Sequence, residues 1–137
     1  MGVPKSFKTV EIMQQCVYGF TLDYVKDLVK NWSVIKDYAF ILHDKDYRPD
    51  GSPREPHIHL MLRFNNSVPT SAILAKLKGV CEVQQLEKMK SWNKAMAYLT
   101  HDTPAAKSQG KHHYDDSEVC SNFSFFLIAE LHKHPLI

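Results

Sequence analysis

The chain lacks several features that define large classes of proteins. Its 137 residues contain no apolar run long enough to cross a membrane, and the N-terminus lacks the pattern of a secretion signal. Cysteine is scarce, since Cys16, Cys81 and Cys120 are odd in number, widely spaced and without a CxxC pattern. This argues against a disulfide framework and favours reduced, core or half-buried thiols in a cytoplasmic protein.

A nucleotide-binding loop and a strong net charge are also missing. No GxxxxGK[ST] pattern occurs, so the sequence gives no sign of helicase activity. The formal net charge of +2 is too small to indicate nucleic-acid binding by itself. Lysines do crowd the second half of the chain, although a solvated face explains such a series equally well. These lysines are Lys76, Lys78, Lys88, Lys90, Lys94, Lys107 and Lys111.

The apolar periodicity predicts a single domain of mixed α and β structure. Helices are expected after the capping residue Thr21, from Pro69 to Gly79, and over residues 92–103, where Pro104 ends the last one. The apolar segment 123–131 is expected to dock on the body of the domain. Strands are expected over 7–16, 38–42, 58–64 and 80–86. This order predicts an α+β fold in which helices cover an antiparallel sheet.

Histidines gather at one predicted hairpin. The first strand ends in His43, a turn-rich loop carries Asp46, and the next strand begins with His57 and His59. Because side chains alternate along a strand, both histidines of the second strand point to one face, while Ile58 and its apolar neighbours point to the other. Pairing of the two strands brings all four polar side chains within reach of one another.

These residues predict a metal site. A single histidine on a strand is most often solvated or hydrogen-bonded, and Asp-Lys-Asp in a loop is usually just polar. The combination differs, because a one-residue register slip would bury both imidazoles of the His57-x-His59 pair in the core. Asp46 is a hard oxygen ligand, which favours Mg²⁺ or Mn²⁺ over a structural zinc site, although ligand type does not exclude zinc.

The predicted helix over residues 92–103 carries a tyrosine beside its apolar stripe. Tyr98 lies at the edge of this stripe, with Lys94 one turn before it and His101 one turn after it. Such a tyrosine is usually an amphipathic residue at the core edge, with its hydroxyl in water. Next to a metal site, a cation and a phosphodiester, the phenol becomes a nucleophile for transesterification.

Three motifs together resemble a known family. His43-Asp44-Lys45-Asp46, Pro56-His57-Ile58-His59 and Tyr98-Leu99-Thr100-His101 are similar, in order and spacing, to the HUH endonuclease domain of rolling-circle replication initiators. The plasmid Rep proteins of Gram-positive bacteria are the most similar group. The resemblance runs from about residue 38 to 115 and includes the segment Lys111-His112-His113-Tyr114-Asp115.

The resemblance implies a fold and a reaction. The sheet would have about five antiparallel strands flanked by helices. His57, His59, Asp46 and His43 would hold Mn²⁺ or Mg²⁺. Tyr98 would attack a phosphodiester in a single-stranded or hairpin origin, leaving a 5′-phosphotyrosyl link and a free 3′-OH. From their place on the same flank of the helix, and not from the resemblance, Lys94 and His101 are the expected catalytic partners of Tyr98.

The resemblance also implies partners. Host polymerase would extend the nicked strand in the bacterial cytoplasm, with host helicase as a further partner. Residues 1–137 are expected to be a single domain, the N-terminal nuclease part of a longer, oligomeric Rep protein. The first-strand motif is placed at Thr9 to Gln15. The residues expected to contact DNA are Gln14, Arg48, Lys107, Lys111, His112 and Tyr114.

Three other functions remain open on the sequence alone. A single-tyrosine HUH transposase or relaxase would use the same chemistry. A non-catalytic nucleic-acid binder built on the sheet would use the histidines structurally. A metal-dependent hydrolase that uses water as the nucleophile would cut DNA without a covalent adduct.

Overall fold

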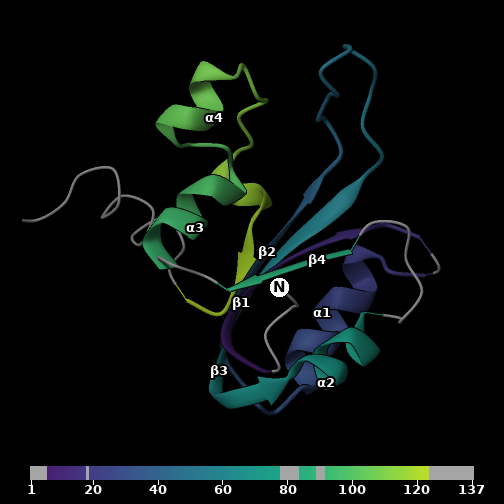
Figure 1. The fold of residues 1–137 in the computed structure, drawn as a ribbon, viewed down its shortest axis with the longest axis vertical. Coiled ribbons are helices and arrows are strands. Elements are labelled where there is room, and N and C mark those ends of the chain that lie inside the picture. The colour runs from purple at the N-terminus through teal and green to yellow at the C-terminus, as the bar shows by residue number, and fades with distance from the viewer. Residues whose placement is uncertain (1–5, 18, 78–83, 89–91, 124–137) are drawn as a thin grey trace, which may run out of the picture.

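The chain forms one antiparallel sheet with helices on both faces (Figure 1). The computed structural model describes residues 6–17, 19–77, 84–88 and 92–123. The sheet has the strand order β4-β1-β3-β2-β5. These strands are β1 (Ser6–Gln15), β2 (Ile35–His43), β3 (His57–Pro69), β4 (Gln84–Lys88) and the two-residue β5 (Cys120–Ser121). The predicted α+β fold is confirmed.

The alternating sequence of β3 sets the two faces of the sheet. Ile58, Leu60 and Leu62 are fully buried on one face, where α1 (Leu22–Asn31) and α2 (Thr70–Lys76) pack. Met61 lies on the other face and packs with Met96 and Leu99 of α3 (Trp92–Leu99). Figure 1 shows α1 and α2 on one side of the sheet, with α3 and α4 (Pro104–Ser108) on the other.

Several predicted local signals are present. Thr21 caps α1, since its hydroxyl accepts a hydrogen bond from the backbone N–H of Tyr24 over 3.2 Å. Strands β2 and β3 form the predicted hairpin, in which His43 pairs with His57. The connection between them projects beyond the sheet and approaches the α4 region (Figure 1). This projecting hairpin loop, residues 44–56, forms one wall of the site described below.

The predicted helix over residues 92–103 is wrong at its C-terminal end. Helix α3 stops at Leu99, and His101 adopts a left-handed backbone with φ of 60°. The N–H groups of His101 and Asp102 then bond to the carbonyls of Tyr98 and Ala97, both over 2.9 Å, which forms a Schellman cap. Pro104 begins the separate helix α4 instead of merely ending α3.

Other predictions fall partly outside the described residues. The strand expected over 80–86 is seen as β4 from Gln84, and Gly79, Cys81 and most of segment 123–131 lie outside the described part. Cys16 and Cys120 are half-buried free thiols. Within the described ranges, no helix has the length and apolar character needed to cross a membrane.

Candidate metal and tyrosine site

Three histidines meet where β2 ends and β3 begins. Paired strand positions place His43 beside His57, and the alternation adds His59 on the same face. The ring centroid of His43 lies 5.4 Å from that of His57 and 4.3 Å from that of His59. One nitrogen from each ring lies within 4.8 Å of the other two. The predicted convergence of these three imidazoles is therefore present.

Backbone carbonyls orient two of these rings. Nε2 of His43 donates to the carbonyl of Leu99 over 2.6 Å, and Nδ1 of His57 donates to the carbonyl of Glu55 over 2.9 Å. In the neutral rings this leaves the lone pairs on Nδ1 of His43 and Nε2 of His57. Both atoms are buried and have no hydrogen-bond partner among the described residues. A carbonyl that fixes the tautomer in this way is typical of metal-binding histidines.

Asp46 faces these lone pairs. Its Oδ2 lies 3.4 Å from Nδ1 of His43 and 3.3 Å from Nε2 of His57. Burial alone would raise the pKa of Asp46, but hydrogen bonds from His43 and His57, when the facing nitrogens carry a proton, and from Tyr114 outweigh it and hold this pKa well below its usual range. The carboxylate therefore stays charged at neutral pH and offers a hard oxygen donor beside the imidazoles.

Tyr114 supports the carboxylate from behind. Its hydroxyl donates to Oδ1 of Asp46 over 2.7 Å and accepts from the backbone N–H of Lys45 over 3.0 Å. Burial, together with the bond to Asp46, raises the pKa of Tyr114, so its hydroxyl stays protonated and continues to donate. Its ring is fully buried and stacks on His43 at 4.3 Å. The prediction that Tyr114 contacts DNA is wrong, because this side chain holds Asp46 and His43 in place.

The donor set fits a divalent cation. Buried imidazole lone pairs and an ionised carboxylate converge, and within the described part of the chain the two unpartnered nitrogens have no hydrogen-bond donor. Burial lowers the pKa of His59, and the neighbouring His43 and His57 add to this, so the ring is neutral and able to bind a metal. A second group of close donors joins His43 and Asp46 to His101.

The left-handed backbone of His101 turns its imidazole into the site. Its Nδ1 donates to the carbonyl of His112 over 2.7 Å and lies 3.9 Å from Oδ1 of Asp46. The ring is only 3% exposed, and burial lowers its pKa. A non-glycine residue with positive φ is uncommon, and such strain clusters at functional sites. Helical periodicity gave no signal for this turn.

Tyr98 projects from α3 toward the histidines. Its ring centroid lies 6.0 Å from that of His59 and 5.4 Å from that of His101. Its hydroxyl accepts a hydrogen bond from Nζ of Lys111 over 2.9 Å. Lys94, the cation expected beside this tyrosine, is on α3, but its side chain lies outside the described part of the structure. The contact with Lys111, which was expected to bind DNA, was missed by the sequence reasoning.

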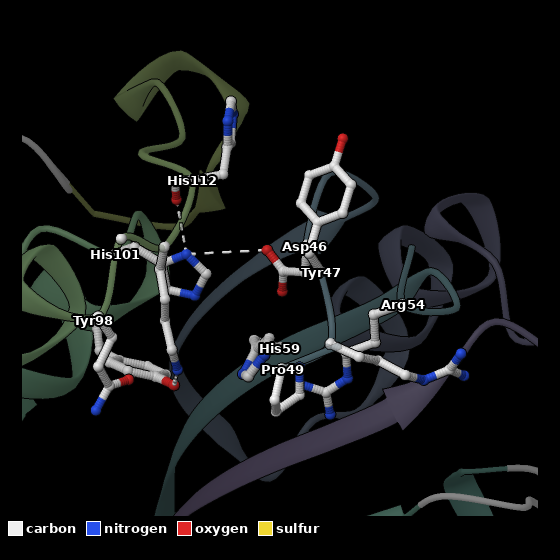
Figure 2. A pocket seen from close by; sticks show the side chains of 12 residues that line it. Asp46, Tyr47, Pro49, Arg54, His59, Tyr98, His101 and His112 are labelled. Carbon is white, nitrogen blue, oxygen red and sulfur yellow. Dashed lines mark hydrogen bonds and ion pairs between the residues drawn. The ribbon is translucent and has the colours of Figure 1, made fainter. Parts of the chain in front are cut away.

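A cavity of about 570 Å³ lies between Tyr98 and the hairpin loop. Figure 2 shows Tyr98 and His101 on one side, with Asp46, Tyr47 and Arg54 on the other, and the Asp46 carboxylate points toward His101. His59 opens into this cavity between the two sides. The residues lining the cavity are Asp46, Tyr47, Arg48, Pro49, Arg54, His59, Tyr98, His101, Gln109, Gly110, Lys111 and His112.

The residues predicted to bind DNA lie in three different parts of the structure. Arg48, Lys111 and His112 line the cavity. Lys107 is exposed on α4 and forms an ion pair of 2.9 Å with Asp102. Gln14 is fully buried on the face that α1 and α2 cover, because it alternates with Met13 on β1. The prediction for Gln14 is therefore wrong, since a buried side chain cannot reach DNA.

Comparisons with known proteins show the family of this chain. Residues 4–127 match the family described as plasmid replication protein, origin binding domain. A replication protein of Onion yellows phytoplasma is 35% identical over 112 residues, covering 66% of this chain and 26% of that protein. The replication protein RepB of Lactiplantibacillus plantarum is 29% identical over 101 residues, covering 70% of this chain and 44% of RepB. The chain thus aligns with less than half of either relative, and it belongs to the origin-binding domain family of plasmid replication proteins.

Proposed function

We propose that the domain nicks and rejoins one DNA strand at a plasmid replication origin, with Tyr98 as the nucleophile. The observation that carries this proposal is the shared cavity: the side chains of Tyr98, His59 and Asp46 all line it. A phenol beside a set of metal-binding donors is suited to phosphoryl transfer. Family membership supports the origin as the target.

In this proposal, His43, His57, His59 and Asp46 hold the metal ion. Three imidazoles with one carboxylate suit Mn²⁺ better than Mg²⁺, which prefers oxygen ligands and water. When bound, the ion would polarise a phosphate oxygen and offset the negative charge that develops there. Tyr114 and the carbonyls of Leu99 and Glu55 keep the protein donors oriented for this role.

The reaction exchanges one ester for another. Oη of Tyr98 forms a bond to phosphorus, the bond from phosphorus to the 3′-oxygen breaks, and the tyrosine proton is balanced by the proton gained on the departing 3′-OH. The 5′-phosphate remains on Tyr98. Because the number of phosphodiester links is unchanged, the same site can run the reaction backwards and rejoin the strand.

The cavity suggests an unpaired substrate. Arg54 and Lys111 supply positive charge along its walls, where Arg48 is paired with Glu55, and Tyr47 is 68% exposed on the hairpin loop. Aromatic side chains beside cations are typical of single-stranded nucleic-acid sites. We therefore propose a single strand or an extruded hairpin as substrate. Host polymerase would extend the freed 3′-OH in the bacterial cytoplasm, with host helicase as a further partner. Further parts of a longer Rep protein would support oligomerisation.

The proposal is tested by mixing the protein with single strands that tile a plasmid origin, in the presence of Mn²⁺. A denaturing gel then separates free protein from a covalent adduct. We expect an adduct with the wild type and with Tyr38→Phe, a matched control on another part of the sheet, and none with Tyr98→Phe or with a chelator.

Three outcomes would contradict the proposal. Cut DNA without an adduct indicates a hydrolase that uses water. DNA binding without cutting at any tile indicates a non-catalytic origin-binding module. An adduct that joins two foreign strands but no origin sequence would favour a transposase or relaxase.

A further inference from the structure

The contact between Lys111 and Tyr98 goes beyond the general nicking reaction proposed above. Nζ of Lys111 donates to Oη of Tyr98 over 2.9 Å and lies 5.2 Å from the centre of its ring. An ammonium group only donates hydrogen bonds, so Tyr98 must use an oxygen lone pair for this contact. The phenolic proton therefore points away from Lys111 and stays available for removal.

A second Schellman cap places Lys111 beside Tyr98. Gly110 ends α4 with φ of 69°, and the N–H groups of Gly110 and Lys111 bond to the carbonyls of Lys107 and Ala106, both over 3.1 Å. The next residue, His112, is fixed because its carbonyl accepts the hydrogen bond from His101. Two consecutive helix ends thus place Tyr98, His101 and Lys111 around one cavity.

The ammonium group of Lys111 forms no ion pair within 4.0 Å among the described residues. Lys107, at the end of the same helix, does pair with Asp102. The Lys111 side chain is exposed at the cavity, where incoming phosphate would also approach. The cation is therefore free to act on the tyrosine oxygen and on the phosphoryl group that this oxygen attacks.

We propose that Lys111 is a catalytic residue for Tyr98: its ammonium group orients the phenol oxygen and offsets the negative charge on this oxygen during strand cleavage and rejoining. This inference rests on the proposed nicking function. It assigns to Lys111 the role that periodicity along α3 suggested for Lys94. Substitution of Lys111 should therefore change the cleavage rate more than the affinity for DNA, because the contact with Tyr98 is already made in the free protein.

The test is single-turnover cleavage and rejoining of an origin strand that the wild type cleaves, with saturating DNA and Mn²⁺. We expect Lys111→Met to slow both directions by about 10- to 100-fold and Lys111→Arg to recover much of the rate. Strand affinity is measured separately in a Tyr98→Phe background, where we expect the Lys111→Met change to cost less than about threefold. Lys26→Met, which removes an exposed lysine from α1 on the opposite face, is the control for charge.

The outcomes separate the inference from the function on which it rests. Normal saturating rates with weakened affinity would make Lys111 a phosphate contact only and overturn its catalytic role. Unchanged rates and affinity would overturn it as well, while leaving the nicking function intact. Failure of the wild type to form a Tyr98 adduct at any origin strand would overturn both. Thermal unfolding of each variant confirms that the exposed substitution leaves the fold intact.

Discussion

The hydroxyl of Tyr114 donates to Oδ1 of Asp46 over 2.7 Å, although 68 residues separate the two in the sequence. The same ring stacks on His43 with an interplanar angle of 8°. One side chain thus orients two of the four proposed metal ligands. This support is formed by the segment after α4 folding back on the hairpin, and it leads to the first prediction.

Tyr114→Phe retains the stacked ring and removes the hydrogen bond to Asp46. We expect Mn²⁺ affinity to fall by about tenfold or more, because outer partners of metal ligands are typically worth 10- to 100-fold. Isothermal titration calorimetry measures this loss. Tyr38→Phe, which leaves the site untouched, controls for the loss of a hydroxyl, and equal Mn²⁺ affinities in the two variants would contradict the role of Tyr114.

His101→Gly and His101→Ala remove the same imidazole from the same backbone position. We expect the glycine variant to be more stable by about 1 kcal/mol, because a left-handed residue with a Cβ is strained. Urea unfolding of the two metal-free variants measures the difference. Equal free energies of unfolding would show that His101 does not hold the left-handed conformation in solution.

Acidification below pH 6.5 should destabilise the metal-free protein. Burial lowers the folded-state pKa of His59 below 6.5, so in that window the unfolded chain binds a proton that the folded chain does not. The free energy of unfolding then falls with pH, at up to about 1.4 kcal/mol per unit for one proton. The depressed pKa of Asp46 acts in a lower window, since its contribution is lost only as the pH falls below about 4.

The comparison of wild type with His59→Asn tests this linkage. Urea unfolding at pH 7.5 and 5.5, with a chelator present, gives the change in stability for each protein. We expect a smaller change in the variant, because one titrating imidazole is gone. A change as large as in the wild type would assign the pH dependence to other groups.

Tyr47→Ala should weaken binding of a single strand by about 5- to 150-fold, because stacking of one base on an aromatic ring is worth about 1–3 kcal/mol. Tyr47→Phe keeps the ring and should bind as the wild type does. Fluorescence anisotropy with Tyr98→Phe as the background separates binding from cleavage. Val34→Ala removes the other exposed large apolar side chain of the described residues and serves as control; an equal effect there would exclude specific stacking.

The sequence by itself determined the elements whose signal is local. Alternation along residues 57–62 placed His57 and His59 on one face, because successive strand side chains must point to opposite sides. Thr21 indicated the start of α1, because a threonine hydroxyl can cap the first turn of a helix. The spacing of His43, Asp46 and the histidine pair around a hairpin was enough to predict that they meet.

Only the tertiary structure decided the contacts between distant segments. The helical periodicity predicted that α3 continues to residue 103, because no local signal marks His101 as left-handed. In the structure the ring of His101 bonds to the carbonyl of His112 at this turn. Lys111 and Tyr114 were predicted to contact DNA as loop residues. In the folded chain Lys111 instead bonds to Tyr98, and Tyr114 is buried against Asp46. A sequence specifies which side chain can donate or accept, but partners separated by many residues are chosen by how the helices and loops pack on the sheet.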